Sequence, residues 1–294
     1  TRPEGIAVVE KLVAGCDVLL ENFTPRVMDN FGLEWEKLKT LNPQLIFVRM
    51  PAFGLDGPWR DNTGFAQTME QLTGLAWVTG HSDDQPRIQR GPCDPLAGMH
   101  AAFTVLLALE ERRVSGQGVH VESTMVEGAL NAAAEQVIEY TAYGNVMQRE
   151  GNRSPEASPQ GLYPCDGHSP ETPRWLALSV VTDAHWNALV DYLGRPGWSL
   201  DPELATREGR RAQADALDAR LGPVFTEKDC GVCVEELVAA GIPAAAVADP
   251  RVSNQHVQLR ARGFHEISEH PIAGSLRLPT LPFRYASVQR WIRH

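Results

Sequence analysis

Three short segments of strand length alternate with segments of helical spacing over the first 150 residues, and this order constrains the fold more than any other feature. Residues 18–20 and 45–48 are apolar and read as buried strands, and a third strand is expected over residues 119–122. Helical patterns precede and separate them, the longest over residues 96–113. Because strands joined through helices pair in parallel, the sequence predicts an open α/β fold, a parallel sheet covered by helices.

Length, composition and charge narrow the class of protein. The chain has 294 residues, 43% of them hydrophobic and 22% charged, so it can bury a large core and is not mainly disordered. A net charge of -10 would repel nucleic acids and anionic membrane surfaces, so neither is expected as a partner. No run of about 18 apolar residues and no signal-peptide pattern occurs, which favours a cytoplasmic protein.

The five cysteines do not indicate a disulfide framework, because their number is odd and they are scattered through apolar stretches. Cys230 and Cys233 form a C-x-x-C pair that is compatible with a redox dithiol or half of a zinc site. The alternative is the buried stripe of a short helix, in which cysteine is a small hydrophobic residue. No second cysteine pair and no histidine pair at a matching distance follows, so no metal is expected.

A polar segment with two prolines, residues 151–159, predicts a domain boundary. Beyond it we expect strands over 175–181 and 242–247, helices over 184–193, 203–221 and 230–240, and a C-terminal β-hairpin with extended chain. The charges between residues 207 and 220 alternate in sign, which is typical of a solvated helix face.

The loops after the first two predicted strands, residues 21–26 and 51–58, are candidates for ligand binding. Ligands of open parallel sheets bind beyond the carboxyl ends of the strands, where such loops converge. Glycine and proline in the second loop allow tight turns and close approach of the backbone. Plain connecting loops are the alternative interpretation, because every α/β sheet has them.

Asp94 is the strongest candidate for a catalytic residue. It precedes Pro95 and the long helical pattern, so its residue type and position predict an N-cap, with Pro95 at the first helical position. The alternative is a nucleophilic carboxylate, which an acyl group could approach over the small residues Ala97 and Gly98.

In order and spacing, several motifs resemble the class III CoA-transferase (CaiB/BaiF) family over essentially the whole chain. In the first half they are residues 17–23 (DVLLENF), 42–46 (NPQLI), 53–58 (FGLDGP), 74–80, Asp94 with Ala97 and Gly98, and 116–118 (GQG). In the second half they are residues 151–152, 163–167, 240–243 and 270–276. Relative to the family, a segment of about ninety N-terminal residues that carries the first strands is absent, and Arg26 stands where glycine is usual.

The resemblance implies a Rossmann-like large domain over residues 1–150, a smaller inserted α+β domain over 151–260, and a return segment over 261–294. It also implies two chains interlocked as a homodimer. The expected activity is transfer of coenzyme A from an acyl-CoA donor to a small carboxylic acid acceptor. By the resemblance, Asp94 is the catalytic nucleophile that forms a covalent aspartyl intermediate, and coenzyme A enters as the acyl-CoA substrate.

The resemblance also assigns residues that contact coenzyme A. Asn22, Phe23 and Thr24 would lie along it, and Asn62, Thr63, Gly64 and Phe65 would pass near its pantetheine and the acyl group. From charge and loop position alone, Arg26, Arg60 and Arg90 are candidate counter-charges for its phosphates, with surface solubility as the alternative.

Two other functions remain open. An α-methylacyl-CoA racemase shares the fold but needs a histidine in the loop where Phe65 stands, and a phenyl ring cannot carry a proton. His100 is the nearby substitute, although a helix-face role fits it better. A non-catalytic subunit of a heteromeric CoA-transferase would be favoured if Asp94 were sealed from any acyl group.

Overall fold

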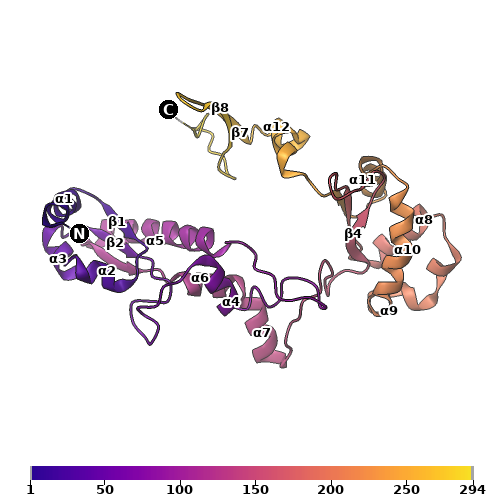
Figure 1. Cartoon of the computed structure of the whole chain (residues 1–294), viewed down its shortest axis with the longest axis horizontal. Helices are drawn as coiled ribbons and strands as arrows, with labels where there is room; N and C mark the ends of the chain where they lie inside the picture. The colour runs from indigo at the N-terminus through magenta and orange to yellow at the C-terminus, as the bar shows by residue number, and fades with distance from the viewer. Residues whose placement is uncertain (1, 293–294) are drawn as a thin grey trace. The chain divides into compact units, whose positions relative to one another are not determined.

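The computed structural model describes residues 2–292 and divides into two compact units, of which the first ends at Gly151 and the second begins at Asn152 (Figure 1). The polar segment expected as a boundary begins at this junction. Each unit has its own sheet and its own buried core. The finer division at residue 260 stays a prediction.

A three-stranded parallel sheet forms the centre of the N-terminal unit. Its strands are β1 (Val18–Glu21), β2 (Ile46–Arg49) and β3 (Val119–Glu122), in the order β1-β2-β3. All four residues of β2, the middle strand, are buried. The predicted open α/β architecture is therefore confirmed, and the three expected strands lie within one residue of their predicted places.

Helices lie on both faces of this sheet. The helices of the unit are α1 (Pro3–Val13), α2 (Pro25–Asn30), α3 (Trp35–Leu41), α4 (Ala66–Leu72), α5 (Cys93–Ser115), α6 (Met125–Ala132) and α7 (Ala134–Tyr143). Alternate residues of β2 point to opposite faces: Phe47 packs in one cluster with Met28 and Leu38 of α2 and α3, whereas Ile46 and Val48 pack with α5. The sheet is thus buried on both sides, as parallel sheets require.

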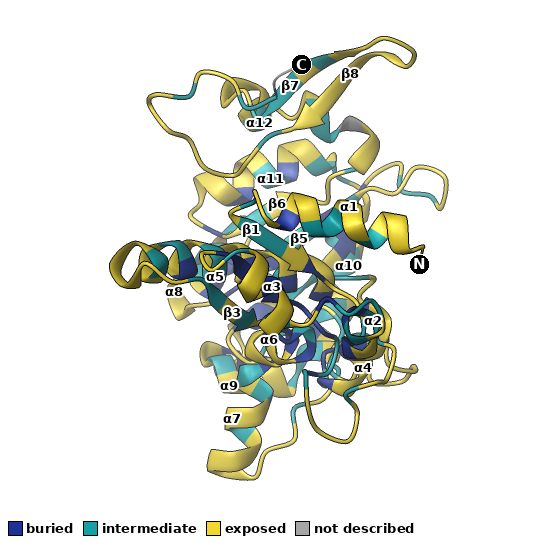
Figure 2. Cartoon of the chain, turned by 90° about the vertical axis from the view of Figure 1, so that its left-hand side faces the viewer, coloured by how far each residue is buried: buried dark blue, intermediate teal, exposed yellow. Residues whose placement is uncertain are grey.

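Two helices of the N-terminal unit leave large apolar side chains in solvent. On α5 these include Phe103 and Leu106, which are 59% and 64% exposed. Helix α7 buries no residue, and Figure 2 shows most of its surface exposed. Exposed apolar surface of this extent is typical of an interaction face.

The C-terminal unit contains an antiparallel sheet of β4 (Gln160–Pro164), β5 (Trp175–Ser179) and β6 (Ala244–Ala246), with β5 in the middle. Its helical segments are α8 (Asp183–Tyr192), η1 (Gly197–Leu200), η2 (Pro202–Ala205), α9 (Arg207–Ala212), α10 (Ala214–Thr226) and α11 (Cys230–Ala239). Leu176 and Leu178 of β5 pack in a core with Leu221 and Phe225 of α10 and Leu237 of α11. The expected helices over 184–193 and 230–240 are confirmed.

The single helix expected over residues 203–221 is wrong. The chain forms η2, α9 and α10 there, with a break at Gln213, whose φ and ψ are -106° and 22°. The interpretation of 207–220 as a wholly solvated face is also wrong, because Arg210 is fully buried. Its guanidinium donates hydrogen bonds to the carbonyls of Ser158 and Leu204 and pairs with Asp183.

The C-x-x-C pair lies on α11, with Cys233 fully buried. Burial is the main cause that raises the pKa of the Cys233 thiol, and it raises the pKa of the neighbouring Cys165 thiol to about 12. Protonated, buried thiols behave as small hydrophobic residues. Between residues 2 and 292, no group of three or more His, Cys, Asp or Glu side chains is arranged to hold a metal ion.

The chain ends with η3 (Pro250–Gln255), α12 (Val257–Ala261) and the antiparallel pair β7 (His265–His270) and β8 (Gly274–Pro279). The expected C-terminal hairpin is confirmed. None of the helices in the described part of the chain combines the length and the apolar character needed to cross a membrane.

Candidate active site

The three parallel strands end in charged residues that lie side by side. Glu21 of β1 is opposite Arg49 of β2, and Arg49 is opposite Glu122 of β3. Residues in register on neighbouring strands project to the same face of a sheet. A row of alternating charge therefore marks the carboxyl edge, where ligands of such folds bind.

Glu21 and Arg49 form a buried ion pair that holds the first candidate loop. The Arg49 Nε donates to Glu21 Oε1 at 2.7 Å, and both residues are 6% exposed. Glu21 Oε2 accepts the backbone N–H of Phe23 at 2.7 Å, and Arg49 donates to the carbonyl of Pro25 at 3.0 Å. The pair thereby fixes the backbone on both sides of Thr24.

Glu122 performs a similar task for the second candidate loop. Its Oε1 accepts the backbone N–H of Leu55 at 2.6 Å and the hydroxyl of Thr124 at 3.2 Å. Charge-assisted bonds of this kind are stronger than bonds between neutral groups. Both loops that follow the first two strands are thus held by side chains from the ends of the strands.

These loops enclose a hollow of about 440 Å³ within the N-terminal unit. Its lining residues are Asn22, Phe23, Thr24, Val27, Met50, Ala52, Thr63, Gly64, Phe65, Asp94 and Met125. A side chain at position 64 would not fit, because its Cβ would lie 2.4 Å from the Cβ of Ala52. Glycine there lets the 63–65 segment pass close to the loop after β2.

Asp94 is not the N-cap that its position before Pro95 predicts. Helix α5 begins one residue earlier, at Cys93, with Pro92 at the N-cap, so Asp94 lies inside the first turn. Its carboxylate is exposed and makes no capping hydrogen bond. The positive end of a helix of 23 residues favours a negative charge at this place. An acyl group can therefore reach a carboxylate that no neighbouring donor occupies.

Seven of the eight residues that the resemblance assigned line this hollow together. They are Asn22, Phe23, Thr24, Thr63, Gly64, Phe65 and Asp94. The structure does not place Arg26 or Asn62 in its lining. Arg26 donates to the carbonyl of Asp61 at 3.1 Å.

Of the candidate phosphate counter-charges, Arg60 is already paired. Its guanidinium contacts Asp29 at 2.6 Å and donates to the carbonyl of Leu55 at 2.7 Å. Arg90 is exposed and adopts a left-handed backbone with φ 64°. Neither arginine lines the hollow.

Four lining residues were not anticipated from the sequence: Val27, Met50, Ala52 and Met125. Ala52 lies in the loop already singled out after β2, and Met50 directly follows that strand, so a search of strand ends would have found both. Val27 and Met125 carry no such signal, because an apolar residue on a short helix is usually part of the core.

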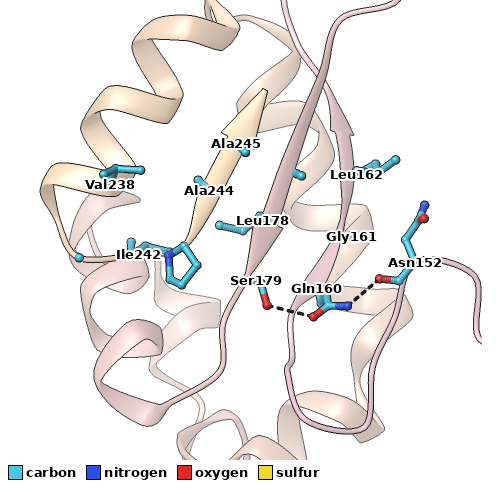
Figure 3. A pocket seen from close by; sticks show the side chains of 13 residues that line it. Asn152, Gln160, Gly161, Leu162, Leu178, Ser179, Val238, Ile242, Ala244 and Ala245 are labelled. Atoms are coloured by element: carbon cyan, nitrogen blue, oxygen red, sulfur yellow. Dashed lines mark hydrogen bonds between the residues drawn. The ribbon is translucent and has the colours of Figure 1, made fainter. Parts of the chain in front are cut away.

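A second hollow, of about 660 Å³, lies in the C-terminal unit against the sheet β4-β5-β6. Figure 3 shows Leu178, Ala244 and Ile242 along it, with a polar end where Ser179 donates to Gln160 and Gln160 donates to the carbonyl of Asn152. Its lining contains no acidic or basic side chain, so it offers no group for acid, base or nucleophilic chemistry.

The sequence pattern of CoA-transferase family III matches residues 1–294. The chain belongs to this family. It is a transferase that moves coenzyme A between an acyl-CoA and an acid, as its relatives do.

Curated relatives and a solved structure agree with this assignment. The chain is 35% identical over 295 residues to a succinyl-CoA:D-citramalate CoA-transferase of Chloroflexus aurantiacus, covering 97% of this chain and 70% of that protein. It is 28% identical to a formyl-CoA:oxalate CoA-transferase of Rhodopseudomonas palustris, covering 92% and 68%. A crystal structure of a CaiB/BaiF family protein from Brucella suis superposes with a TM-score of 0.85 at 26% identity, covering 97% of this chain and 73% of that one.

The racemase alternative gains nothing from the site. Phe65 lines the hollow where a racemase would need a histidine, and His100 does not line it. The Nδ1 atom of His100 instead lies beside Gly128, within α6. The non-catalytic alternative is not favoured either, because its condition was a sealed Asp94 and this carboxylate is exposed.

Proposed function

We propose that Asp94 is the nucleophile of this CoA-transferase. The observation that carries the proposal is an exposed carboxylate in the first turn of α5, free of capping bonds, at the wall of a hollow large enough for a thioester. A carboxylate nucleophile divides one difficult transfer into easier steps through covalent intermediates.

The reaction consists of four substitutions at carbonyl carbons, two that release the donor acid and two that form the acceptor thioester. An Asp94 oxygen attacks the thioester carbonyl, the C–S bond breaks, and a mixed anhydride and the CoA thiolate result. The thiolate attacks the Asp94 carbonyl carbon and expels the donor acid, leaving an aspartyl-CoA thioester. The acceptor carboxylate then attacks this thioester and releases the thiolate, which attacks the acceptor carbonyl and returns Asp94 as a free carboxylate.

The free amides at the start of α5 support these steps electrostatically. The first turn of a helix has N–H groups without intrahelical partners, and such groups stabilise an oxyanion that forms beside them. Pro92 and Pro95 have no N–H, so the free donors of this turn are those of Cys93 and Asp94. The reaction needs no metal, because each leaving group is already an anion.

We assign the walls of the hollow to coenzyme A and the acyl group. Asn22, Phe23 and Thr24 form one wall on the loop held by the Glu21–Arg49 pair. Thr63, Gly64 and Phe65 form another part of the lining. Phe65 is 68% exposed and can pack against an acyl or pantetheine chain. Arg26 and Asn62 remain in the proposal as outer contacts.

The acyl groups that we propose are those of short dicarboxylic acids. Relatives over more than nine-tenths of the chain act, by their names, on succinyl-CoA with D-citramalate or L-malate and on formyl-CoA with oxalate. All but formate carry two carboxylates on a short carbon chain. The proposal extends this shared chemistry to the present chain.

We also propose that the active form is an interlocked homodimer that works in the cytoplasm. The exposed apolar side chains of α5 and α7 support a partner, because surfaces of this kind are normally covered. A dimer of interlocked chains cannot separate without unfolding, so its size in gel filtration should not change on dilution. Relatives named as alpha and beta subunits of one enzyme make a heteromer the outcome to exclude.

Covalent trapping tests the mechanism. The protein is incubated with a panel of short dicarboxylic acyl-CoAs, treated with hydroxylamine or borohydride, and digested for peptide mass analysis. The expected result is modification of the peptide that contains Asp94, absent from the Asp94→Asn variant, whose kcat should fall by about 10³-fold or more.

The proposal would be contradicted if the Asp94 peptide stayed unmodified with every acyl-CoA of the panel and turnover were unchanged in Asp94→Asn. Asp29→Asn is the matched control, since Asp29 pairs with Arg60 outside the lining of the hollow. Exchange of an α-proton for deuterium without any acceptor acid would indicate a racemase instead.

A further inference from the structure

Glu70 is a buried carboxylate that the proposed reaction does not use. It lies on α4, has no exposed surface, and packs beside an apolar cluster that includes Met69 and Cys93. Its Oε1 accepts the backbone N–H of Gly91 at 2.6 Å, whereas its Oε2 has no hydrogen-bond partner. A buried carboxylate oxygen without a hydrogen-bond partner lowers the stability of the fold. Such a residue is expected mainly at or near a functional site.

The segment that Glu70 holds leads directly to Asp94. Arg90 and Gly91 both have left-handed backbones, with φ 64° and 99°. Arg90 is one of two such residues other than glycine between residues 2 and 292. A backbone in this region persists when surrounding contacts fix it, and the bond from Gly91 to Glu70 is such a contact.

Helix α4 connects this segment to another part of the lining of the hollow. The helix begins at Ala66, directly after Phe65, which lines the hollow. Glu70, one turn along α4, reaches across to Gly91, three residues before Asp94. One hydrogen bond thus joins the element that carries Phe65 to the turn that carries the carboxylate.

The surroundings of Cys93 agree with this geometry. The thiol is fully buried, and burial together with the carboxylates of Glu70 and Asp94 raises its pKa to about 11. The thiol therefore lies within the field of both carboxylates. Glu70 is close to the start of α5 on its buried side, while Asp94 is exposed on the other.

We propose that Glu70 is a positioning residue for Asp94: by accepting the Gly91 N–H it fixes the turn before α5 and aims the nucleophile into the hollow. This inference rests on the proposed role of Asp94. Glu70 accepts a hydrogen bond and transfers no proton, so a neutral acceptor of the same length can replace it. Misplacement of a reacting group by about 1 Å costs about 100-fold in rate.

The test measures exchange between succinyl-CoA and ¹³C-labelled succinate in the full chain. Glu70→Gln keeps an oxygen for the Gly91 N–H, and we expect kcat within about threefold of the parent and an unchanged pH profile. Glu70→Met removes the acceptor, and we expect kcat to fall by about 10- to 100-fold with KM for succinyl-CoA within about threefold. Thr73→Val, which removes another buried hydrogen bond near the end of α4, is the control for lost stability.

The inference is overturned if Glu70→Met keeps the parent kcat, if Glu70→Gln loses as much as Glu70→Met, or if Thr73→Val at equal thermal stability loses the same rate. Should Glu70→Met not fold, Glu70→Asp decides, since its shorter side chain keeps the charge and loses the 2.6 Å contact. A parent rate in Glu70→Asp then rejects the inference. Asp94→Asn separates the two proposals, because full exchange in that variant rejects the role of Asp94 itself.

Discussion

The buried charges of the N-terminal unit contact loops that line a hollow, whereas the buried charge of the C-terminal unit contacts the ends of its own structural elements. Glu21 and Arg49 hold the backbone around Thr24, and Glu70 holds Gly91. Arg210 instead ties the carbonyls of Ser158 and Leu204 to Asp183. In the first unit buried charge therefore shapes a site, and in the second it stabilises a fold.

The two sheets explain the contrast. Parallel strands all end at one edge, so the loops that follow them meet and can enclose a ligand. In the antiparallel sheet β4-β5-β6, successive strands end at opposite edges, and the hollow over it is lined by apolar and neutral polar residues. Replacing buried charges in each unit should thus affect different measurements.

Arg210→Met should have the largest effect on stability. It removes a fully buried guanidinium with three carbonyl partners and an ion pair, and it leaves those carbonyls without donors. We expect a loss of about 3–5 kcal/mol in the free energy of unfolding, measured by urea denaturation. Arg207→Met, which removes exposed ion pairs on the same helix, should cost less than about 1 kcal/mol. Equal losses of unfolding free energy in the two variants would show that the burial of Arg210 does not contribute to stability.

Arg49→Met should combine a stability loss with weaker substrate binding. Glu21 would remain buried without its partner, at a cost of about 3 kcal/mol. The double variant Glu21→Gln with Arg49→Met should regain most of this stability. KM for the acyl-CoA should stay raised about 10-fold in both, because the loop around Thr24 has lost the bond to Pro25. An unchanged KM would mean that the pair is structural, like Arg210.

Cys93 should react slowly although it precedes the nucleophile. Its pKa is raised from 9.0 to about 11, so at pH 8 the thiolate fraction falls by about 100-fold. Alkylation by iodoacetamide, followed by peptide mass analysis, should be slower by at least this factor than at the half-buried Cys16. A comparable rate at both cysteines would contradict the burial of Cys93.

The same shift predicts how stability depends on pH. A pKa above the ordinary value means that the neutral thiol favours the folded state. Its contribution is complete below pH 9.0 and is lost as the pH rises through about 11. Thermal unfolding should show this decline, and Cys93→Ala should flatten it.

Tyr163→Phe should have the smallest effect. It removes the 2.7 Å hydrogen bond from the Tyr163 hydroxyl to Asp218 in the C-terminal unit and keeps the ring in the core. We expect a loss of about 1 kcal/mol in urea denaturation, with kcat unchanged. A change in kcat without a loss of stability would give this unit a catalytic part and weaken the contrast between the two.

Much of the fold was predictable because its signals are local. The first two parallel strands follow from short apolar runs, and the third from its place after a long helical pattern. The helix α5 follows from helical spacing that ends before Gly116, whose left-handed backbone closes the helix. The interpretation of residues 207–220 as a solvated face failed because the burial of Arg210 depends on Ser158 and Asp183, which lie far away in the sequence. Alternating charge could not reveal that one of the charged residues is in the core.

The candidate site also has features that the sequence indicated and features that only the structure shows. The strand-end loops and Asp94 could be named from the sequence, whereas the hydrogen bond from Arg26 to the carbonyl of Asp61 could not. The helix α5 begins two residues before the predicted position, because Pro92 and Cys93 gave no stronger capping signal than Asp94 before Pro95. That difference leaves the Asp94 carboxylate free.

The sequence by itself determined the alternation of strands and helices, the apolar interior and the presence of a carboxylate at the start of a long helix. Residue type and spacing act over a few neighbouring positions, so these features need no knowledge of distant contacts. The tertiary structure alone decided that Glu21 meets Arg49 across 28 positions and that Glu70 meets Gly91 across 21. Such pairs form because folding excludes water from both partners, and no local pattern records which partner a buried charge will find.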